Sequence, residues 1–317
     1  MPGNSDPLEV PHVKHREVEF TSGGETVRGD LLLPDGDGPF PVVVMAGGWC
    51  YVKELRQPRY AAEFVAAGVA ALIFDYRRMG ASDGQPRQHI DPWDQIEDYK
   101  NAITYAENLP EVDPARIGIW GISYSGGHVL IVAATDPRVK SVVSNVPVID
   151  GYQTMWRMHG TTRFRKLADL VLAERRKRTE SGDHAYMPMS GEPDNPDAEL
   201  TVWPDNDVRD VFNQLQAGEA PRHQHRNTIE SVELLMQYNA APYAPRMINI
   251  PTMMLVADHD DITMWDQEIA AYNAIPSPAK ELVVLPSTTH MVLYSNLTAL
   301  ELAAQAAARW FTTTLIP

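Results

Sequence analysis

Ser123 is the residue whose surroundings most clearly indicate chemistry. It lies in a glycine- and serine-rich run, residues 121–127, where an apolar segment ends and a helical pattern begins. A nucleophilic serine at such a junction occupies a tight turn that lifts its hydroxyl clear of the sheet, and small neighbours avoid clashes there. Glycine usually stands two residues after this serine, whereas here Ser125, which is also small, takes that place. The run predicts a nucleophile.

A serine hydroxyl is a weak nucleophile near neutral pH, so it needs a base within reach, and the base needs an orienting carboxylate. Among ten histidines, His290 follows the last predicted strand, at the sheet edge where ligands bind in open α/β sheets. We therefore expect His290 to be the general base. The residues alone leave the carboxylate open: Asp258, Asp260 and Asp261 follow one strand. Asp150, after another strand, is a further candidate.

Acyl transfer also needs two N–H donors for the oxyanion of the tetrahedral intermediate. The backbone N–H of Tyr124 is one expected donor, because it begins a helix whose dipole favours negative charge. The second is expected from the turn at residues 47–50, where two glycines let the backbone approach a substrate closely. Cys50 has no partnered base in the sequence, so we expect it to be a small loop residue.

These residues must be positioned by secondary structure that is regular over the first half of the chain. Apolar runs at residues 41–45, 69–74, 117–122 and 139–143 alternate with amphipathic segments at 60–67, 94–109 and 126–134. Runs that are apolar on both faces are typical of parallel strands covered by helices. Residues 18–21 and 27–33 indicate an antiparallel pair. The alternation predicts an α/β protein with a doubly wound, mostly parallel sheet.

That alternation stops at about residue 150 and resumes at about residue 247, with a strand at 251–256. We expect residues 1–149 and 247–317 to form one catalytic domain, and residues 150–246 to form a mainly helical cap. Aromatic side chains in the cap suit an adaptable apolar pocket. The cap residues expected to bind substrate are Tyr152, Trp156 and Trp203.

The chain resembles the α/β-hydrolase superfamily over nearly its whole length. The resemblance is carried by the run 121–127, by Ala46-Gly47-Gly48-Trp49, by residues 74–84 and by the final order of aspartate and histidine. It is closest to the branch of dienelactone-hydrolase-like and X-Pro-peptidase-like esterases. The resemblance implies a helical cap on an α/β-hydrolase fold and a triad in the chain order Ser, Asp, His.

The same resemblance narrows two assignments. Residues 257–263 match the family's pattern after this strand with Asp260 in the acid position. The residue just after the paired glycines, Trp49, becomes the first choice for the second oxyanion donor, and Gly48 is the second choice.

Composition excludes several classes of function. The chain has 317 residues and a net charge of −15, which disfavours nucleic acid and anionic membranes as partners. Its single cysteine excludes an intramolecular disulfide framework and a cysteine-based zinc site. No secretory leader and no membrane-spanning run are evident, so we expect a cytoplasmic protein. A homodimer is compatible with the sequence, which fixes no oligomeric state.

The sequence thus predicts a serine hydrolase that cleaves small-molecule carboxylic esters through an acyl-enzyme, with neither a metal nor an organic cofactor. The same triad serves a lactonase, a thioesterase, a C–C hydrolase, an amidase or an acyltransferase, so these stay open. A non-catalytic binding module that retains the fold is a remote alternative. The pair His223 and His225 is a weak metal-binding pattern.

Overall fold

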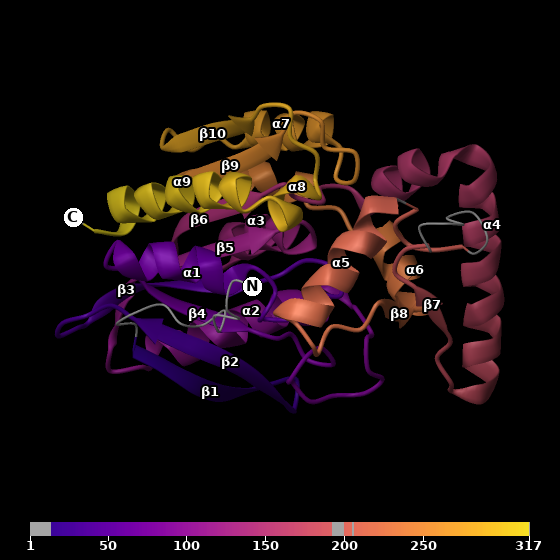
Figure 1. The fold of residues 1–317 in the computed structure, drawn as a ribbon, viewed down its shortest axis with the longest axis horizontal. Helices are drawn as coiled ribbons and strands as arrows, with labels where there is room; N and C mark the ends of the chain where they lie inside the picture. Colours follow the sequence, from indigo (N-terminus) through magenta and orange to yellow (C-terminus); the bar gives the residue numbers. More distant parts are fainter. Residues whose placement is uncertain (1–13, 192–199, 205, 317) are drawn as a thin grey trace, which may run out of the picture.

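An eight-stranded sheet forms the centre of the molecule (Figure 1). The computed structural model describes residues 14–191, 200–204 and 206–316. The strands are β1 (Lys14–Ser22), β2 (Glu25–Leu33), β3 (Phe40–Ala46), β4 (Ala70–Phe74), β5 (Val112–Ile122), β6 (Val139–Asn145), β9 (Thr252–Ala257) and β10 (Lys280–Leu285). Their order across the sheet is β1-β2-β4-β3-β5-β6-β9-β10.

The pairing of these strands confirms the expected doubly wound, mostly parallel sheet. Strand β2 pairs antiparallel with β1 and with β4, and every other pair in this sheet is parallel. All residues of β4 and β9 are buried, because helices cover both faces of the sheet. The edge strand β1 instead alternates buried and exposed residues over its second half.

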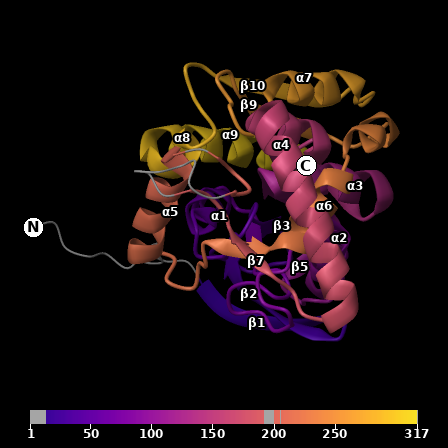
Figure 2. The same ribbon diagram turned by 90° about the vertical axis from the view of Figure 1, so that its right-hand side faces the viewer.

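Helices cover the two faces of the sheet, as Figure 2 shows. On one face lie α1 (Gln57–Ala66) and α9 (Leu297–Leu315), which pack against each other; on the other lie α2 (Pro92–Glu107) and α3 (Tyr124–Thr135). Asp91 caps α2 by accepting from the N–H of Trp93, and Asn296 caps α9 by accepting from that of Ala299. Side-chain oxygens at these positions satisfy amides that a helix leaves unpaired. Two further helices, α7 (Trp265–Ala274) and α8 (Val292–Ser295), follow β9 and β10.

The segment between β6 and β9 is mainly helical and lies to the right of the sheet in Figure 1. It contains α4 (Gly151–Ser181), β7 (Tyr186–Pro188), α5 (Asn206–Gly218), β8 (Arg226–Thr228), α6 (Ile229–Gln237) and the 3-10 helix η1 (Ala241–Arg246). Strands β7 and β8 form a short antiparallel pair that the sequence pattern did not indicate. Helix α4 breaks at Gly160, whose φ of 60° and ψ of 172° are not helical. We refer to residues 150–246 below as the cap segment.

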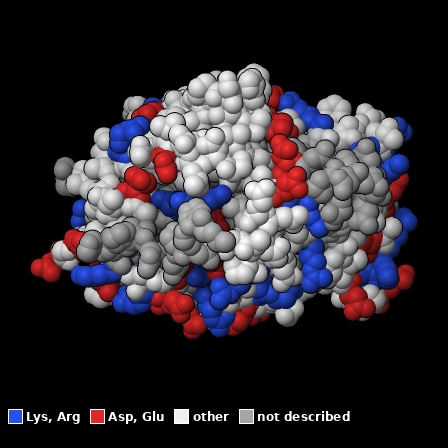
Figure 3. All heavy atoms as spheres, in the orientation of Figure 1, with Lys and Arg blue, Asp and Glu red and all other residues white. Residues whose placement is uncertain are grey.

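The described surface carries acidic and basic side chains side by side over most of the face in Figure 3. An uncharged area occupies the upper part of that view. Val284 on β10 and Leu302 on α9 are exposed apolar residues. The homodimer stays a prediction. None of the helices in the described ranges has an apolar stretch long enough to cross a lipid bilayer.

At the end of β5, Gly121 packs directly against the backbone of Ser125, where no side chain fits. A Cβ atom added at Gly121 would lie 2.2 Å from the carbonyl oxygen of Ser125, a distance that atoms cannot adopt. We predict that Gly121→Ala lowers the free energy of unfolding by about 3 kcal/mol, measured by urea denaturation, because such overpacking forces the backbone to move. Gly218→Ala is the matched control, since nothing lies within 4 Å of its added Cβ. Equal stability of the two variants would contradict the prediction.

Candidate active site

Ser123 lies at a strained turn between β5 and α3. Its φ of 58° and ψ of −118° are rare for a residue with a side chain. The turn is held by backbone bonds on both sides: the N–H of Ser123 donates to the carbonyl of Asn145 at 2.9 Å, and its carbonyl accepts from the N–H of Val148 at 3.0 Å. The hydroxyl of Ser123 is therefore fixed at the carboxyl edge of the sheet, as the sequence predicted.

Ser125 occupies the position where the family pattern has glycine, and its side chain is bonded on two sides. Its hydroxyl donates to the carbonyl of Gly47 and lies 2.5 Å from the hydroxyl of Tyr76. The substitution of serine for glycine thus connects the turn after β5 with the turn after β3.

His290 and Asp260 form a buried pair. Nδ1 of His290 lies 2.8 Å from Oδ2 of Asp260, and both side chains are almost completely excluded from solvent. Oδ1 of Asp260 accepts from the N–H groups of Ile262 at 2.9 Å and Thr263 at 2.7 Å. Burial tends to raise the pKa of Asp260, but the interaction with His290 and these amide bonds outweigh it, so the pKa lies below its usual value. The carboxylate is therefore charged and oriented toward the imidazole.

The other candidate aspartates lie elsewhere. Asp258 accepts from the N–H of Thr288 at 3.1 Å and lies partly exposed beside His259. Asp150 caps α4 and accepts from the side-chain amide of Asn239 at 3.0 Å. Asp261 is exposed. Of the alternatives that the residues left open, the structure brings Asp260 to His290.

A neighbouring carboxyl group, Glu268 on α7, was not expected from the sequence. It is fully buried, and the hydroxyl of Thr263 donates to its Oε1 at 2.7 Å. Burial and the nearby charge of Asp260 raise the pKa of Glu268 well above its usual value. Glu268 contacts Thr263 rather than His290, so Asp260 is the carboxylate that faces the imidazole.

Ser123 and His290 line one narrow pocket between the sheet and the cap segment. Its walls are mostly aromatic and apolar: Trp49, Tyr51, Met189, Trp203, Val208, Phe212, Ile262, Met291 and Tyr294. The space between these side chains, including its opening to solvent, is about 310 Å³. Among the described residues no hydrogen bond joins Ser123 to His290. Such catalytic bonds are often long before substrate binds.

Tyr294 is a residue of this pocket that sequence reasoning missed. Its ring stacks on the imidazole of His290, with centroids 5.6 Å apart and an interplanar angle of 28°. Burial raises the pKa of Tyr294, and a hydrogen bond with Ser123 acts in the opposite direction. The signal available in the sequence was its position four residues after His290, one helical turn further along.

The proposed oxyanion turn lies against the nucleophile. A Cβ at Gly48 would lie 2.9 Å from the Cβ of Ser123, so the Gly48 backbone approaches the serine as closely as a glycine permits. Trp49 follows, and its ring lies edge-on to that of Tyr124 with centroids 5.2 Å apart. The three residues expected to stabilise the oxyanion, Tyr124, Trp49 and Gly48, thus surround Ser123.

The cap segment holds this turn in place through contacts that the sequence did not indicate. The indole N–H of Trp49 donates to Oδ1 of Asn227 at 3.1 Å, and the carbonyl of Cys50 lies 3.0 Å from Nδ1 of His223. Burial raises the pKa of the Cys50 thiol, which accords with the expectation that it is an unreactive loop residue.

The predicted substrate-binding residues divide between the pocket and the surface. Trp203 lines the pocket and lies edge-on to Trp49. Tyr152 and Trp156 lie on α4 with 48% and 44% of their surface exposed, and neither belongs to the pocket wall. The ring of Tyr152 instead contacts that of Phe164, and a role of Tyr152 and Trp156 in substrate binding stays a prediction.

The sheet order, the serine at the turn after β5, and the aspartate and histidine after β9 and β10 define the α/β-hydrolase class. The sequence profile of the S15 family, described as X-Pro dipeptidyl-peptidase, matches residues 23–291. The chain belongs to this family. The resemblance to the α/β-hydrolase superfamily is confirmed.

Several known proteins are similar to this chain. The quorum-quenching protein AidA of Acinetobacter baumannii (strain MDR-ZJ06) is 42% identical over 159 residues, 50% of this chain and 52% of that protein. The acyltransferase drtE of Aspergillus calidoustus is 31% identical over 88% of each chain. The thiohydrolase aneE of Aspergillus aculeatus (strain ATCC 16872 / CBS 172.66 / WB 5094) is 29% identical over 84% of this chain and 83% of that protein. The structure of DcsB complexed with its substrate analogue has a TM-score of 0.81 at 24% identity, covering 96% of this chain and 100% of that one.

The Asp260–His290 pair predicts a specific loss of activity. We expect Asp260→Asn to lower kcat on a p-nitrophenyl ester by about 10⁴-fold, because the amide no longer holds the imidazole in the required tautomer. Asp258→Asn, which changes a partly exposed neighbour, should retain most of the activity. Similar kcat values for the two variants would show that Asp260 does not act through His290.

The same pair has a consequence for stability. The pKa of Asp260 is lower in the folded protein than in the unfolded chain. The ionised carboxylate therefore adds to the free energy of unfolding at any pH above the unfolded pKa of about 4. This contribution is lost as the pH falls through the folded-state pKa. In Asp260→Asn this part of the pH dependence of thermal unfolding should disappear.

Proposed function

We propose that this protein is a serine hydrolase that cleaves carboxylic esters through an acyl-enzyme at Ser123. The observation that carries the proposal is the buried 2.8 Å contact between His290 and Asp260, in the same pocket as a serine held at a strained turn. A base that is oriented by a carboxylate and lies next to a serine is the arrangement that activates a hydroxyl for attack on a carbonyl.

In the first half of the reaction, Oγ of Ser123 attacks the ester carbonyl and its proton passes to His290. Because Nδ1 of His290 faces Asp260, Nε2 is the nitrogen that takes this proton. The tetrahedral oxyanion accepts hydrogen bonds from the backbone N–H groups of Tyr124 and Trp49. Collapse of the intermediate breaks the ester bond, and the alcohol leaves with the proton that His290 returns.

In the second half, water attacks the acyl-enzyme and His290 acts as base again. The acid is released and Ser123 regains its proton. Each oxyanion donor is worth roughly 2.7–4 kcal/mol of barrier in comparable sites, so the position of the Trp49 turn matters for rate. The contacts of Asn227 and His223 with that turn support its role, because they fix the backbone next to the nucleophile.

The pocket wall favours an apolar acyl group over a peptide. Aromatic rings and methionine line it, and no aspartate or glutamate stands among its described lining residues to pair with a peptide's N-terminal ammonium. For this reason we propose esters as substrates, despite the family's description as a dipeptidyl-peptidase. The cap segment contributes Met189, Trp203, Val208 and Phe212 to the wall, so it takes part in selecting the acyl group.

The relatives support acyl transfer as the reaction type. An acyltransferase and a thiohydrolase both move an acyl group from a leaving group to an acceptor, as an esterase does. They differ in the leaving group and in whether water is the acceptor. Thioester hydrolysis and acyl transfer to an alcohol are thus the alternatives that a substrate panel must separate.

We predict that Ser123→Ala lowers the rate of p-nitrophenyl butyrate hydrolysis by about 10⁶-fold, because the nucleophile of the triad is lost. Ser181→Ala, at the exposed end of α4, is the control and should hydrolyse the ester at the wild-type rate. Both variants should keep the wild-type circular dichroism spectrum. Substantial hydrolysis by folded Ser123→Ala would refute the proposal.

The same assay distinguishes the leaving groups. Wild-type protein should hydrolyse the butyrate ester but release no p-nitroaniline from Ala-Pro-p-nitroanilide, because the pocket offers no partner for the ammonium group. A higher kcat/KM on the peptide substrate would show a peptidase, and a higher value on butyryl-CoA would show a thioesterase. Product analysis in the presence of methanol separates transfer from hydrolysis.

A further inference from the structure

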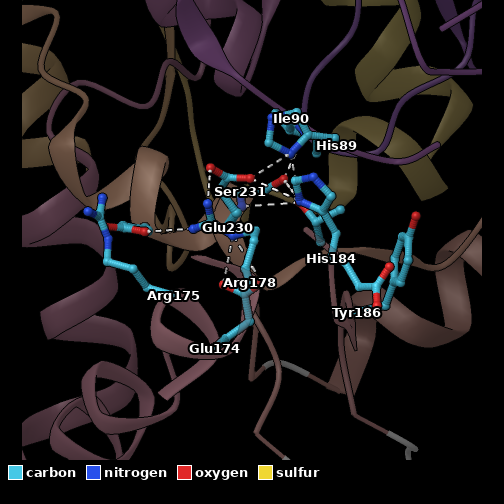
Figure 4. A network of polar contacts seen from close by, with 12 residues as sticks. His89, Ile90, Glu174, Arg175, Arg178, His184, Tyr186, Glu230 and Ser231 are labelled. Atoms are coloured by element: carbon cyan, nitrogen blue, oxygen red, sulfur yellow. Dashed lines mark hydrogen bonds and ion pairs between the residues drawn. The ribbon is translucent and has the colours of Figure 1, made fainter. Parts of the chain in front are cut away.

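A second group of polar side chains converges outside the active site, where the cap segment meets the loop between β4 and α2. His89 comes from that loop, His184 from the turn after α4, and Glu230 from the first turn of α6. One ligand atom from each of the three lies within 4.8 Å of the other two. Figure 4 shows both imidazoles on one side of Glu230 and Arg175 on the other.

The carboxylate of Glu230 has a different environment at each oxygen. Nη1 of Arg178 lies 2.9 Å from Oε1. Oε2 lies 3.0 Å from Nδ1 of His184 and 3.8 Å from Nδ1 of His89. The guanidinium therefore orients the carboxylate through one oxygen, and the other oxygen faces the two imidazoles. Metal-ligating carboxylates are commonly held by such a hydrogen bond at the oxygen that does not ligate.

Nδ1 of His184 is a buried atom that makes no hydrogen bond in the described structure. It lies 3.0 Å from Oε2 of Glu230, yet the direction of the ring nitrogen does not allow a hydrogen bond between them. This nitrogen thus contacts Glu230 by charge alone, without a hydrogen bond. A nitrogen and a carboxylate oxygen that converge in this way are two potential ligands for one cation.

His89 is held in place from behind. Its Nδ1 lies 2.9 Å from the hydroxyl of Thr228, which in turn lies 2.7 Å from the hydroxyl of Ser231. The N–H of Ile90 donates to Ser231 at 2.7 Å. Because Nδ1 is bonded to Thr228, the ring nitrogen left to bind an ion is Nε2, and the bond at Nδ1 fixes the orientation of the ring.

We propose that His89, His184 and Glu230 form a binding site for a divalent transition-metal ion, with Zn²⁺ as the representative. Two imidazoles and one carboxylate, with water as a fourth ligand, are a donor set that Zn²⁺ accepts, whereas Mg²⁺ and Ca²⁺ prefer oxygen ligands. Ligand atoms at about 2.0–2.2 Å from Zn²⁺ lie about 3.3 Å apart, and the ligand atoms of this cluster lie within 4.8 Å of one another, so no pair has to close by more than about 1.5 Å on binding.

The site is structural rather than catalytic, since it lies apart from the pocket that holds Ser123. It joins three segments that also meet through hydrogen bonds, such as the N–H of Thr228 to the carbonyl of Gln88 at 3.1 Å and the N–H of Ile229 to the carbonyl of Ala185 at 2.9 Å. Asn227, which contacts Trp49 in the active site, is the residue next to Thr228. A bound ion would therefore fix the part of the cap segment that holds the oxyanion turn.

Metal binding is measured on the full chain after removal of metals with EDTA, by isothermal titration and by thermal unfolding with ZnCl₂. At a Zn²⁺ concentration 100-fold above Kd we expect the midpoint of unfolding to rise by about 5 °C. His184→Ala should weaken Zn²⁺ binding by roughly 100-fold or more, since it removes one of three ligands. Glu230→Gln, which keeps the side chain's shape, should weaken it as well. His15→Ala on β1 is the matched control and should bind like the wild type.

Co²⁺ provides a readout that reports the ligands directly. Wild-type protein with Co²⁺ should show visible d–d absorption typical of nitrogen and oxygen ligands, and His184→Ala should lose it. Wild type that binds neither Zn²⁺ nor Co²⁺ would overturn the proposal. Binding that persists in His184→Ala and is lost in His225→Ala would also overturn it, because the ion would then occupy the pair at His223 and His225. Mg²⁺ and Ca²⁺ should leave the unfolding temperature unchanged.

Discussion

The strained backbone at Ser123 is the constraint on which the rest of this structure depends. A residue with a side chain keeps φ at 58° only where its surroundings leave no alternative. Here β6 supplies Asn145 on one side, and Ser125 connects the turn to the carbonyl of Gly47 on the other. The position of the nucleophile therefore depends on the neighbouring strand β6, and the turn after β3 is held next to it by the contact with Ser125.

The cap segment is coupled to this constraint through the oxyanion turn. Asn227 contacts the indole of Trp49 and His223 contacts the carbonyl of Cys50, so a shift of β8 would disturb the turn proposed to stabilise the oxyanion. The pocket is also narrow as it stands, and the same segment forms part of its wall through Trp203. The cap segment thus contacts both the pocket that would admit substrate and the turn proposed to stabilise the oxyanion. A metal ion bound at Glu230, in the helix that follows β8, would restrict the movement of β8.

The sequence was informative where chemistry follows directly from strand ends. The sheet follows from apolar runs, and the positions of Ser123 and His290 follow from where those runs stop. The choice of Asp260 among neighbouring aspartates needed the resemblance to the family as well. It was uninformative where residues far apart meet: Asn227 reaches Trp49 from 178 positions away, and no local pattern marks either for that contact. Tyr152 and Trp156 show the converse difficulty, because aromatic residues in a cap segment suit a pocket wall equally well as an exposed helix face, and only the rotation of α4 decides between them.

The most direct test of the account is covalent labelling of the wild-type protein with a fluorophosphonate, followed by mass spectrometry of the peptides. Such a reagent reacts with a serine only when a base has activated it and an oxyanion site stabilises the adduct. The account predicts a single adduct on Ser123 that forms within minutes and is prevented by prior incubation with an ester substrate. A folded protein that stays unlabelled, or that carries the adduct on Ser125, would contradict it.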